Sequence, residues 1–405
     1  MIKARKTRKI RIGSIDMGGD APIVVQTMTA TKTGDVEATA RSVNELVDSG
    51  AAIVRVAVDN IGDVEALAKI RQRTHGNISV DLQENIRLAE RVAPYVDKIR
   101  YNPGKLNSVD PETPWQKKVD YLVEIAQRYD CALRVGVNCG SLDATLLNDP
   151  DVRKKIEERV ADKCIGAETP VSVLSAIEHT DYLESVNFQR FCVSIKDSNP
   201  FTTLLVNRLF SSLRPEVPLH LGVTEAGIPP RGVLKTRVAL EPLLAEGIGD
   251  AIRVSLTVPA KDKSKEIEAG KTILANVANG VVANPDLLNA NALDVVSCPS
   301  CSRVQNERFV ELAQQIVKAT EFAKDYPFKI AVMGCRVNGP GETDDADIGL
   351  WCGGNRVNLK SGARDLGSFG YDEIIEKTLE LLNQKIQIYS AAQKVSPLSD
   401  GDYVV

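Results

Sequence analysis

The stretch LRVGVN at residues 133–138 decides the fold, because it is one of eight short β-rich runs that alternate with longer helical patterns. The stretch before it, PWQKKVDYLVEIAQRYD at 114–130, repeats apolar residues every three or four positions, which is typical of an amphipathic helix. Eight strands with intervening helices over about 250 residues predict a (β/α)8 TIM-type barrel. A doubly wound sheet is the alternative, but no glycine-rich dinucleotide fingerprint follows the first strand. The other seven runs are IVVQTMT (23–29), IVRVAV (53–58), ISVDL (78–82), KIRYN (98–102), FCVSIK (191–196), LHLGVTE (219–225) and IRVSLT (252–257).

A second, smaller domain is expected after the barrel. The stretch VVANPDLLNANALD at 281–294 is rich in turn-forming residues and predicts a linker, where we expect a hinge. Beyond it come an amphipathic helical pattern at 304–324 and the strand-like KIAVMG at 329–334. We therefore expect a barrel over residues 1–285 and an α/β domain over residues 286–405.

Composition narrows the classes of function. The chain has 405 residues, a formal net charge of −4 and eight cysteines. No run of apolar residues reaches the ~18 that suggest a membrane span, and the small net charge gives no general affinity for nucleic acid. Scattered cysteines without a secretion signal favour a reducing compartment over a disulfide framework. We expect a cytoplasmic protein that binds neither a membrane nor nucleic acid.

Alternation within the strands places cations on the inner face of the barrel. Side chains two residues apart on a strand share a face. Five strands each contribute one cation to the inner face, and four of these cations have a small polar neighbour on the same face. The cations are Arg55, Arg100, Arg134, Lys196 and Arg253, and their polar neighbours are Asn102, Asn138, Ser194 and Ser255.

This set of cations predicts a bound polyanion. Few carboxylates occupy strand positions that point to the same inner face as these cations. Like charges buried together are too costly to keep without counter-charge. A diphosphate supplies that counter-charge, because arginine offers bidentate donors to phosphate oxygens and lysine offers a point charge. The alternative is that the cations are held in internal salt bridges. Active sites of barrel enzymes lie at the C-terminal ends of the strands, where these residues fall.

Glu225 is an acidic residue, unlike the cations of the other strands. It lies at the end of the predicted seventh strand, in HLGVTEAG at 220–227. A carboxylate among cations has its pKa lowered by charge unless desolvation dominates. We predict that Glu225 is a general acid or orients the hydroxyl groups of a substrate. A structural partnership with one arginine is the alternative.

Three cysteines and a glutamate predict a metal centre. Cys298 and Cys301 lie in SCPSCSR at 297–303, and Cys335 and Glu342 lie in GCRVNGPGE at 334–342. Thiolates at this density favour zinc or an iron–sulfur cluster over calcium or magnesium. A C-x-x-C pair alone also occurs in structural zinc sites and in redox dithiols.

Together these strings resemble the 4-hydroxy-3-methylbut-2-enyl diphosphate synthase family of the methylerythritol phosphate route to isoprenoids. The resemblance implies a TIM-type barrel that binds a cyclic diphosphate and a C-terminal domain that carries a [4Fe–4S] cluster. It also implies a homodimer in which the cluster domain of one subunit caps the barrel of the other. The strings are VVQTMT, GAAIVRVAV, KIRYNPG, RVGVNCGSL, PLHLGVTEAG, GIGDAIRVSLT, SCPSC and MGCRVNGPGE.

The resemblance also implies roles for particular residues. Glu225 matches the acidic residue that faces the substrate, and Asn338 matches a substrate contact from the cluster domain. Gln83 stands where many members of the family have a histidine, and an amide cannot exchange a proton near neutral pH. The implied cluster ligands are Cys298, Cys301, Cys335 and Glu342. The implied diphosphate contacts are Arg55, Arg100, Asn102, Arg134, Asn138, Lys196, Arg253 and Ser255.

The reaction implied by the resemblance is the reductive ring opening of 2-C-methyl-D-erythritol 2,4-cyclodiphosphate to 4-hydroxy-3-methylbut-2-enyl diphosphate. The cluster supplies electrons, which come from flavodoxin or ferredoxin, and Glu225 and Glu342 are the candidate catalytic residues. The alternatives are a zinc-stabilised, non-redox enzyme that handles phosphate, a pterin-binding barrel enzyme, and a non-catalytic carrier of the cluster.

Overall fold

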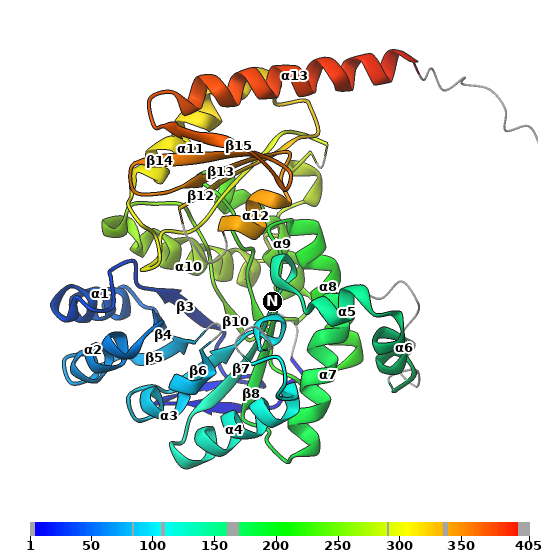
Figure 1. The fold of residues 1–405 in the computed structure, drawn as a ribbon. Coiled ribbons are helices and arrows are strands. Elements are labelled where there is room, and N and C mark those ends of the chain that lie inside the picture. Colours follow the sequence, from blue (N-terminus) through cyan, green and yellow to red (C-terminus); the bar gives the residue numbers. More distant parts are fainter. Residues whose placement is uncertain are drawn as a thin grey trace, which may run out of the picture. The chain divides into compact units, whose positions relative to one another are not determined.

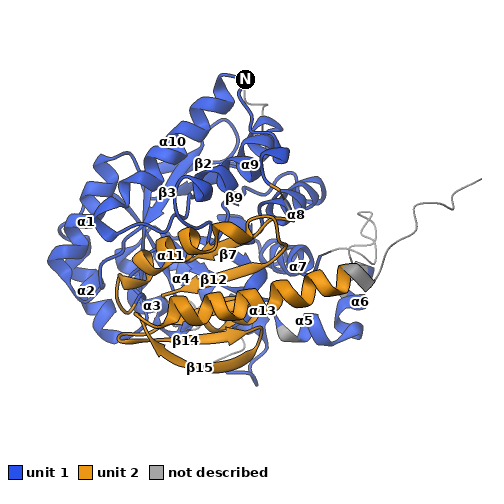
Figure 2. Ribbon diagram, turned by 90° about the horizontal axis from the view of Figure 1, so that it is seen from above, with its two compact units in different colours: residues 1–288, 298–304 blue, residues 289–297, 305–405 orange. Residues whose placement is uncertain are grey.

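The computed structural model describes residues 5–82, 85–106, 110–159, 170–289, 291–334 and 339–395. The chain forms two compact units (Figure 2). The first unit is Met1–Leu288 with Cys298–Val304, and the second is Asn289–Ser297 with Gln305–Val405. Cys298–Val304, which we expected within the second domain, thus groups with the barrel. No helix among the described residues is long and apolar enough to cross a lipid bilayer.

The first unit is a parallel barrel, as predicted. Its sheet runs in the order β8-β7-β6-β5-β4-β3-β10-β9. A parallel bridge between Val193 in β8 and Leu219, just before β9, joins the two ends of the sheet. The strands are β3 (Val24–Met28), β4 (Ile53–Ala57), β5 (Asn77–Asp81), β6 (Lys98–Tyr101), β7 (Ala132–Asn138), β8 (Phe191–Lys196), β9 (His220–Leu221) and β10 (Ala251–Ile252).

Helices cover the outside of the barrel (Figure 1). Two of them begin at side-chain caps that the sequence provides: Asp35 accepts a hydrogen bond from the Ala38 amide, and Asn199 accepts one from the Phe201 amide. The helices are α1 (Val36–Asp48), α2 (Ile61–Arg71), α3 (Ala89–Val92), α4 (Trp115–Arg128), α5 (Ala144–Asn148), α6 (Pro150–Arg159), α7 (Val171–Ser185), α8 (Pro200–Leu213), α9 (Arg231–Ala245) and α10 (Ser264–Ala278).

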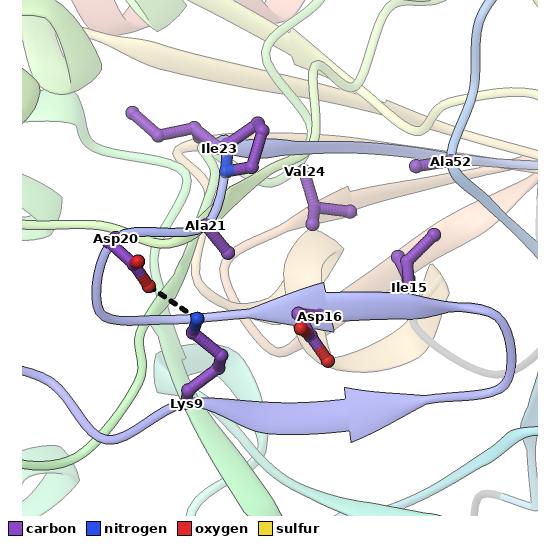
Figure 3. Close-up of a pocket in the computed structure, with 9 residues that line it drawn as sticks. Lys9, Ile15, Asp16, Asp20, Ala21, Ile23, Val24 and Ala52 are labelled. Atoms are coloured by element: carbon purple, nitrogen blue, oxygen red, sulfur yellow. Dashed lines mark ion pairs between the residues drawn. The ribbon is translucent and has the colours of Figure 1, made fainter.

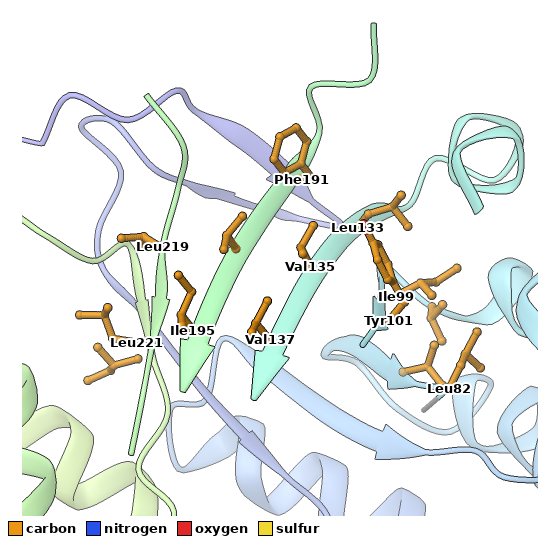
Figure 4. Packing of buried hydrophobic residues seen from close by; sticks show 14 of the residues in the cluster. Leu82, Ile99, Tyr101, Leu133, Val135, Val137, Phe191, Ile195, Leu219 and Leu221 are labelled. Carbon is orange, nitrogen blue, oxygen red and sulfur yellow. The ribbon is translucent and has the colours of Figure 1, made fainter. Parts of the chain in front are cut away.

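The alternation of the strands divides the barrel into an apolar outer layer and a polar interior. Figure 4 shows Leu133, Val135 and Val137 along one face of β7, near Ile195 of β8, in the core between strands and helices. Arg134 lies on the opposite face of the same strand, because successive side chains point to opposite sides. The apolar face of each strand therefore packs against the helices, and the opposite face points into the barrel with its polar side chains.

A hairpin closes the N-terminal end of the barrel. Strands β1 (Ile10–Ile12) and β2 (Ile15–Met17) pair antiparallel. Ile10, Ile12 and Met17 are buried against the first residues of the barrel strands. The partners at the strand ends are Val24, Ile53, Ala132, Cys192 and Ala251. The floor of the barrel is thus apolar, and the polar side chains lie toward the other end.

The last two barrel strands are shorter than predicted. The sequence pattern indicated strands over 219–225 and 252–257, whereas β9 and β10 each contain two residues. Beyond β10 the backbone bonds to groups outside the ladder, because the Thr257 amide donates to the Gly227 carbonyl and the Leu256 amide donates to Glu266 Oε1. This end of the chain therefore forms a loop at the mouth of the barrel.

The second unit is a mixed α/β layer. Its sheet runs in the order β11-β12-β13-β14-β15. The first three strands pair in parallel, and β14 and β15 pair antiparallel. The strands are β11 (Asp294–Ser297), β12 (Lys329–Met333), β13 (Ile348–Cys352), β14 (Arg356–Ser361) and β15 (Arg364–Gly370), and the helices are α11 (Arg308–Ala319), α12 (Gly339–Asp344) and α13 (Ile374–Val395).

Candidate active site

Five cations of the barrel strands lie close enough to interact through their charges, and we call Arg55, Arg100, Arg134, Lys196 and Arg253 the cation array. Lys196 ends β8 and Arg253 follows β10, whereas the three other members lie within β4, β6 and β7. The parallel register sets Arg100 of β6 beside Arg134 of β7. Four members of the array are buried, and the side chain of Arg55 is 12% exposed. The alternation of the sequence predicted that these side chains share the barrel interior, and their role as substrate contacts stays a prediction.

The members of the array repel one another. Burial first, and the charge of Arg100 second, lower the pKa of Arg134 to about 10. Burial, followed by the charges of Arg134 and Arg253, holds the pKa of Lys196 well below its usual value. Like charges buried together in this way are costly unless an opposite charge compensates for them.

Asp81 is the counter-charge that the sequence analysis missed. Its carboxylate lies 3.0 Å from Arg100 Nη1, 3.4 Å from Arg55 Nη1 and 3.8 Å from Arg303 Nη1. Burial alone would raise the pKa of Asp81, but Arg100, Arg55 and Arg303 hold it well below its usual range. The predicted alternative of internal salt bridges is thus correct for Arg55 and Arg100. The signal was present in the sequence, because Asp81 is the fourth residue of the run ISVDL at 78–82 and alternates with its apolar residues.

The rest of the array has no carboxylate partner among the residues that the structure describes. Lys196 and Arg253 form no ion pair there, and Nε and Nη2 of Arg253 are buried without a hydrogen-bond partner. Arg134 Nη1 lies 3.3 Å from Nδ1 of His220. Burial and the charges of Lys196 and Arg134 hold the pKa of His220 well below its usual value, so the imidazole is neutral. Among the described residues, these three buried cations thus form no ion pair with a carboxylate, although Arg134 feels the charge of Asp81.

Lys98 is a further inward cation that the analysis did not single out. It precedes Arg100 by two residues on β6 and is fully buried. Its ammonium donates a hydrogen bond of 2.8 Å to Gln26 Oε1, and burial lowers its pKa to about 8. Because its described partner is a neutral amide, Lys98 adds to the positive character beneath the array.

Two glycines in or beside the strands make room for the cations. A Cβ atom on Gly136 of β7 would lie 2.2 Å from Arg100 Nε. A Cβ atom on Gly222, just after β9, would lie 2.7 Å from Lys196 Nζ. Any other residue at these positions would displace the charged groups, so the backbone here is shaped around them.

The predicted amide and hydroxyl residues also lie at this end of the barrel. Asn102 accepts a hydrogen bond from the Gly104 amide and donates one to Ser141 Oγ. Asn138 accepts one from the Gly140 amide. Ser255 is buried in the loop after β10. These contacts fix the turns that follow the strands and orient the polar side chains of the site.

Glu225 has an unusual backbone. It is 2% exposed, and its φ of 47° lies in the left-handed region that favours glycine. Asp130 and Asn187 also have positive φ, but each closes a helix, whereas Glu225 follows a strand. A non-glycine residue held in this conformation costs about 1–3 kcal/mol, and such residues cluster at functional sites.

The segment Cys298–Val304 is tied to the barrel mouth by several hydrogen bonds. Thr257 Oγ1 donates to the Cys298 carbonyl at 3.1 Å, and the hydroxyl of Ser300 donates to the Val258 carbonyl. Lys32 Nζ donates to the Ser302 carbonyl at 2.7 Å and to the Val304 carbonyl. The backbone of this segment is therefore held in place by side chains from two different loops.

Only part of the predicted metal site can be followed in the structure. Cys298 is buried, Cys301 is partly buried, and neither forms a disulfide bond. Glu342 is buried in α12 of the second unit. Cys335, Asn338 and Gln83 lie outside the described residues. Within the described ranges, no three Cys, His, Asp or Glu side chains form a metal site, so the predicted ligand set stays a prediction.

A separate pocket lies at the opposite end of the barrel (Figure 3). It is lined by Lys9, Asp20, Val24 and Ala52 among others, and Lys9 pairs with Asp20 at 2.5 Å. Val24 begins β3 and Ala52 precedes β4, so the pocket is at the N-terminal end of the strands. It contains no member of the cation array, and we do not assign the chemistry to it.

The chain is similar to known proteins over almost its whole length. Residues 7–271 match the GcpE TIM-barrel domain, and residues 294–384 match the GcpE protein C-terminal domain. A protein of Rhodopirellula baltica named 4-hydroxy-3-methylbut-2-en-1-yl diphosphate synthase (flavodoxin) is 51% identical over 95% of this chain and 97% of its own. A protein of the same name from Acinetobacter baylyi is 37% identical over 95% of each chain.

Among solved structures, the dihydropteroate synthase of Thermus thermophilus covers 66% of this chain and 99% of its own. Its TM-score is 0.43 and its sequence identity is 14%. A likeness at this level supports no conclusion about function.

Proposed function

Because the chain belongs to the GcpE family, we propose that it reduces 2-C-methyl-D-erythritol 2,4-cyclodiphosphate to 4-hydroxy-3-methylbut-2-enyl diphosphate. It is an oxidoreductase of isoprenoid biosynthesis, like the relatives that share its whole length. The observation that supports this substrate most directly is the array of buried cations, of which Lys196 and Arg253 have no counter-charge among the described residues. Neither the zinc enzyme nor the pterin enzyme considered above is supported by these relatives.

The cation array binds the diphosphate. Arg134, Lys196 and Arg253 face the ligand with their charges uncompensated, and Arg55 and Arg100 keep part of theirs for it because they share one carboxylate. When the ring opens, a C–O bond to phosphate breaks and the phosphate oxygen leaves as an anion. Fixed cations in a site from which water is excluded stabilise that growing charge without reorganising. Asn102, Asn138 and Ser255 supply hydrogen bonds that orient the substrate.

A [4Fe–4S] cluster held by Cys298, Cys301, Cys335 and Glu342 supplies electrons one at a time when it is bound. The described part of this ligand set fits such a group, because Cys298 and Cys301 are thiols without a disulfide bond on a segment whose backbone is anchored. Carboxylate ligation by Glu342 gives one position that is harder and more easily displaced than a thiolate. Asn338 is the proposed substrate contact from the second unit.

Glu225 delivers a proton in this proposal. The balanced reaction consumes two electrons and one proton, releases one water and leaves the new diphosphate with one more negative charge. The departing hydroxyl needs that proton, and Glu225 lies at the end of the barrel strands where the substrate binds. A general acid at this position is consistent with the strained backbone of Glu225, whose φ is positive, because such residues cluster at functional sites.

Reduced flavodoxin is the proposed electron donor, since the relatives carry that word in their names, and ferredoxin is the alternative. We also propose a cytoplasmic homodimer in which the cluster domain of each subunit caps the barrel of the other.

A direct assay tests the proposed function. Protein purified without oxygen is mixed with a chemical reductant and the cyclic diphosphate, and phosphorus NMR follows the conversion of the cyclic to the linear diphosphate. We expect turnover by a brown protein that contains iron. A colourless protein with stoichiometric zinc, or an iron-loaded protein that leaves the cyclic diphosphate intact, would contradict the proposal.

A further inference from the structure

Arg303 lies two residues after Cys301, the second cysteine of the C-x-x-C pair, and is almost completely buried. Its guanidinium makes a bidentate pair with Asp59, with Nε 2.9 Å and Nη2 2.7 Å from Oδ1. Nη2 also donates to the Asp81 carbonyl at 3.1 Å, and Nη1 lies 3.8 Å from the Asp81 carboxylate. All three residues belong to the first unit. Arg303 is thus the one side chain of the Cys298–Val304 segment, among those described, that forms ion pairs with the barrel strands and their loops.

Asp81 connects this segment to the cation array. The same carboxylate serves Arg303, Arg55 and Arg100, at 3.8, 3.4 and 3.0 Å. A carboxylate has a limited number of acceptor positions, so the three guanidiniums compete for it. When a polyanion draws Arg55 and Arg100 toward itself, more of the attraction of Asp81 remains for Arg303.

We propose that Arg303 is a positioning residue that holds the Cys298–Val304 segment at the barrel mouth through Asp59 and Asp81, and that Asp81 couples this hold to occupation of the cation array. Binding of the cyclic diphosphate tightens the segment that carries Cys298 and Cys301. By thermodynamic reciprocity, a firmly held segment also favours binding of the diphosphate. The inference rests on the proposed function, because the cyclic diphosphate is its ligand.

Hydrogen–deuterium exchange of the iron-loaded, full-length protein tests the coupling. The measured peptide spans residues 298–304, and exchange is followed without oxygen, with and without the cyclic diphosphate. In the wild-type protein we expect the ligand to slow exchange of this peptide about tenfold or more. In Arg303→Gln we expect exchange without ligand to be faster by a similar factor and the response to the ligand to be lost.

Kinetics provide a second readout for Arg303→Gln. The cation array remains intact in this variant, so KM for the cyclic diphosphate should rise by no more than about tenfold, the factor by which the ligand slows exchange. The value of kcat should fall about tenfold to a hundredfold, because a displaced segment misplaces the electron source. Arg303→Lys keeps the charge but loses the bidentate geometry, and it should restore part of both kcat and the exchange response.

Two further variants keep the result interpretable. Arg237→Gln removes a comparable bidentate pair, with Glu241 on α9, and should behave like the wild type in exchange and in kcat. Asp59→Asn removes only the more exposed partner of Arg303, so it should speed exchange yet keep the response to the ligand. If Arg303→Gln does not retain iron, Asp59→Asn still tests whether Arg303 anchors the Cys298–Val304 segment.

The outcomes separate this inference from the proposed function. If the wild-type protein neither binds nor converts the cyclic diphosphate, the proposed function fails. If the wild-type protein converts it and Arg303→Gln shows wild-type exchange with and without ligand, only the role of Arg303 fails. A change in Arg237→Gln equal to that in Arg303→Gln would also overturn the inference, since the effect would then be general.

Discussion

Lys196 and Lys263 are both buried lysines of the barrel unit, but only one of them has a carboxylate partner among the described residues. Lys263 Nζ lies 2.8 Å from Glu266 Oε1, and both side chains are at most 2% exposed. Lys196 has four arginines around it and a pKa well below the usual value, through burial first and these charges second. Among the described residues, the same residue type is therefore paired with a carboxylate in one place and surrounded by like charges in the other.

This difference predicts that replacing lysine by methionine affects stability differently at the two positions. Lys196→Met removes a buried repulsive charge, so the free energy of unfolding should stay the same or rise, while affinity for the cyclic diphosphate falls by roughly 2 kcal/mol, or about thirtyfold in Kd. Lys263→Met is the matched control. It leaves Glu266 charged and buried without its lysine and should cost about 3–5 kcal/mol of stability. Denaturant melts and calorimetric titration check both; a Lys196→Met protein that is strongly destabilised would mean that Lys196 is structural.

Asp81 gives a second prediction at this scale. The cations hold its pKa well below the usual range, so the carboxylate is ionised throughout the working range of pH. Asp81→Asn leaves Arg55, Arg100 and Arg303 without their shared counter-charge and should destabilise the protein by about 3–5 kcal/mol.

An added polyanion should compensate for part of this loss. Inorganic pyrophosphate should therefore raise the melting temperature of Asp81→Asn more than that of the wild type. An equal rise in both proteins would show that the anion binds away from these arginines.

The sequence predicted the residues of the cation array because strand periodicity fixes which side chains share a face. It could not predict which cations are neutralised, because that depends on distances between strands. Asp81 was overlooked although it lies within a predicted strand, and Arg303 was overlooked because its partners are more than two hundred residues away. For Cys335, Asn338 and Gln83 the assignments remain predictions, since they lie outside the described residues.

Among the elements, strand β7 has a glycine where a side chain would disturb the site. In Gly136→Ala the new Cβ would lie 2.2 Å from Arg100 Nε, so Arg100 must move. We expect KM for the cyclic diphosphate to rise about tenfold, as for the loss of one charge-assisted contact, with iron content unchanged. Gly34→Ala is the control, because a Cβ there meets no atom within 4 Å. Wild-type KM in Gly136→Ala would show that Arg100 does not contact the substrate.

Helix α7 contains a histidine that predicts a pH effect on stability. His179 is buried, lies 4.1 Å from the Trp115 ring and 3.3 Å from the Tyr101 hydroxyl, and burial lowers its pKa to about 3. In the unfolded chain His179 is protonated below about pH 6.5, whereas in the folded protein it stays neutral down to about pH 3. Stability is therefore lost as the pH falls from 6.5 toward 3.

Between pH 7 and pH 5 this amounts to about 2 kcal/mol from His179. His179→Gln should therefore show a shallower loss of stability over this interval than the wild type, measured by denaturant melts at each pH. Parallel curves for the two proteins would contradict the neutral state of His179.

The elements themselves were largely predictable. Alternating apolar residues located every barrel strand, and the helix expected at 114–130 is α4 (Trp115–Arg128). The pattern overestimated β9 and β10, because residues past their ends read as strand but bond to loops and to the Glu266 side chain. Periodicity describes which face a residue takes; it does not show where the neighbouring strand ends.

For the whole molecule, the proposed dimer can be tested by mixing two inactive variants. Cys335→Ser should lose the cluster, and Arg134→Ala should keep the cluster but bind substrate weakly. If each barrel is capped by the partner, a mixed dimer contains one intact site and should regain up to about a quarter of the activity in a statistical mixture. Without regained turnover, the cluster would serve the barrel of its own chain, the chain to which Cys298–Val304 is bonded here.

The sequence predicted two domains, but it did not predict which segments of the chain belong to each. The barrel and the mixed α/β unit follow from strand and helix patterns. Cys298–Val304 groups with the barrel because of particular hydrogen bonds, from Thr257, Lys32 and Arg303, which no local pattern encodes. Long-range contacts of this kind are decided by the folded structure as a whole.

The hairpin of β1 and β2 has a consequence for the order of folding. It leaves the ribosome before the barrel strands, yet its apolar side chains rest on residues as distant as Ala132, Cys192 and Ala251. The base of the cylinder therefore cannot be sealed until translation has passed the last of these positions. During that interval Ile10, Ile12 and Met17 are exposed to water, and a growing polypeptide in this state is a natural client for chaperones.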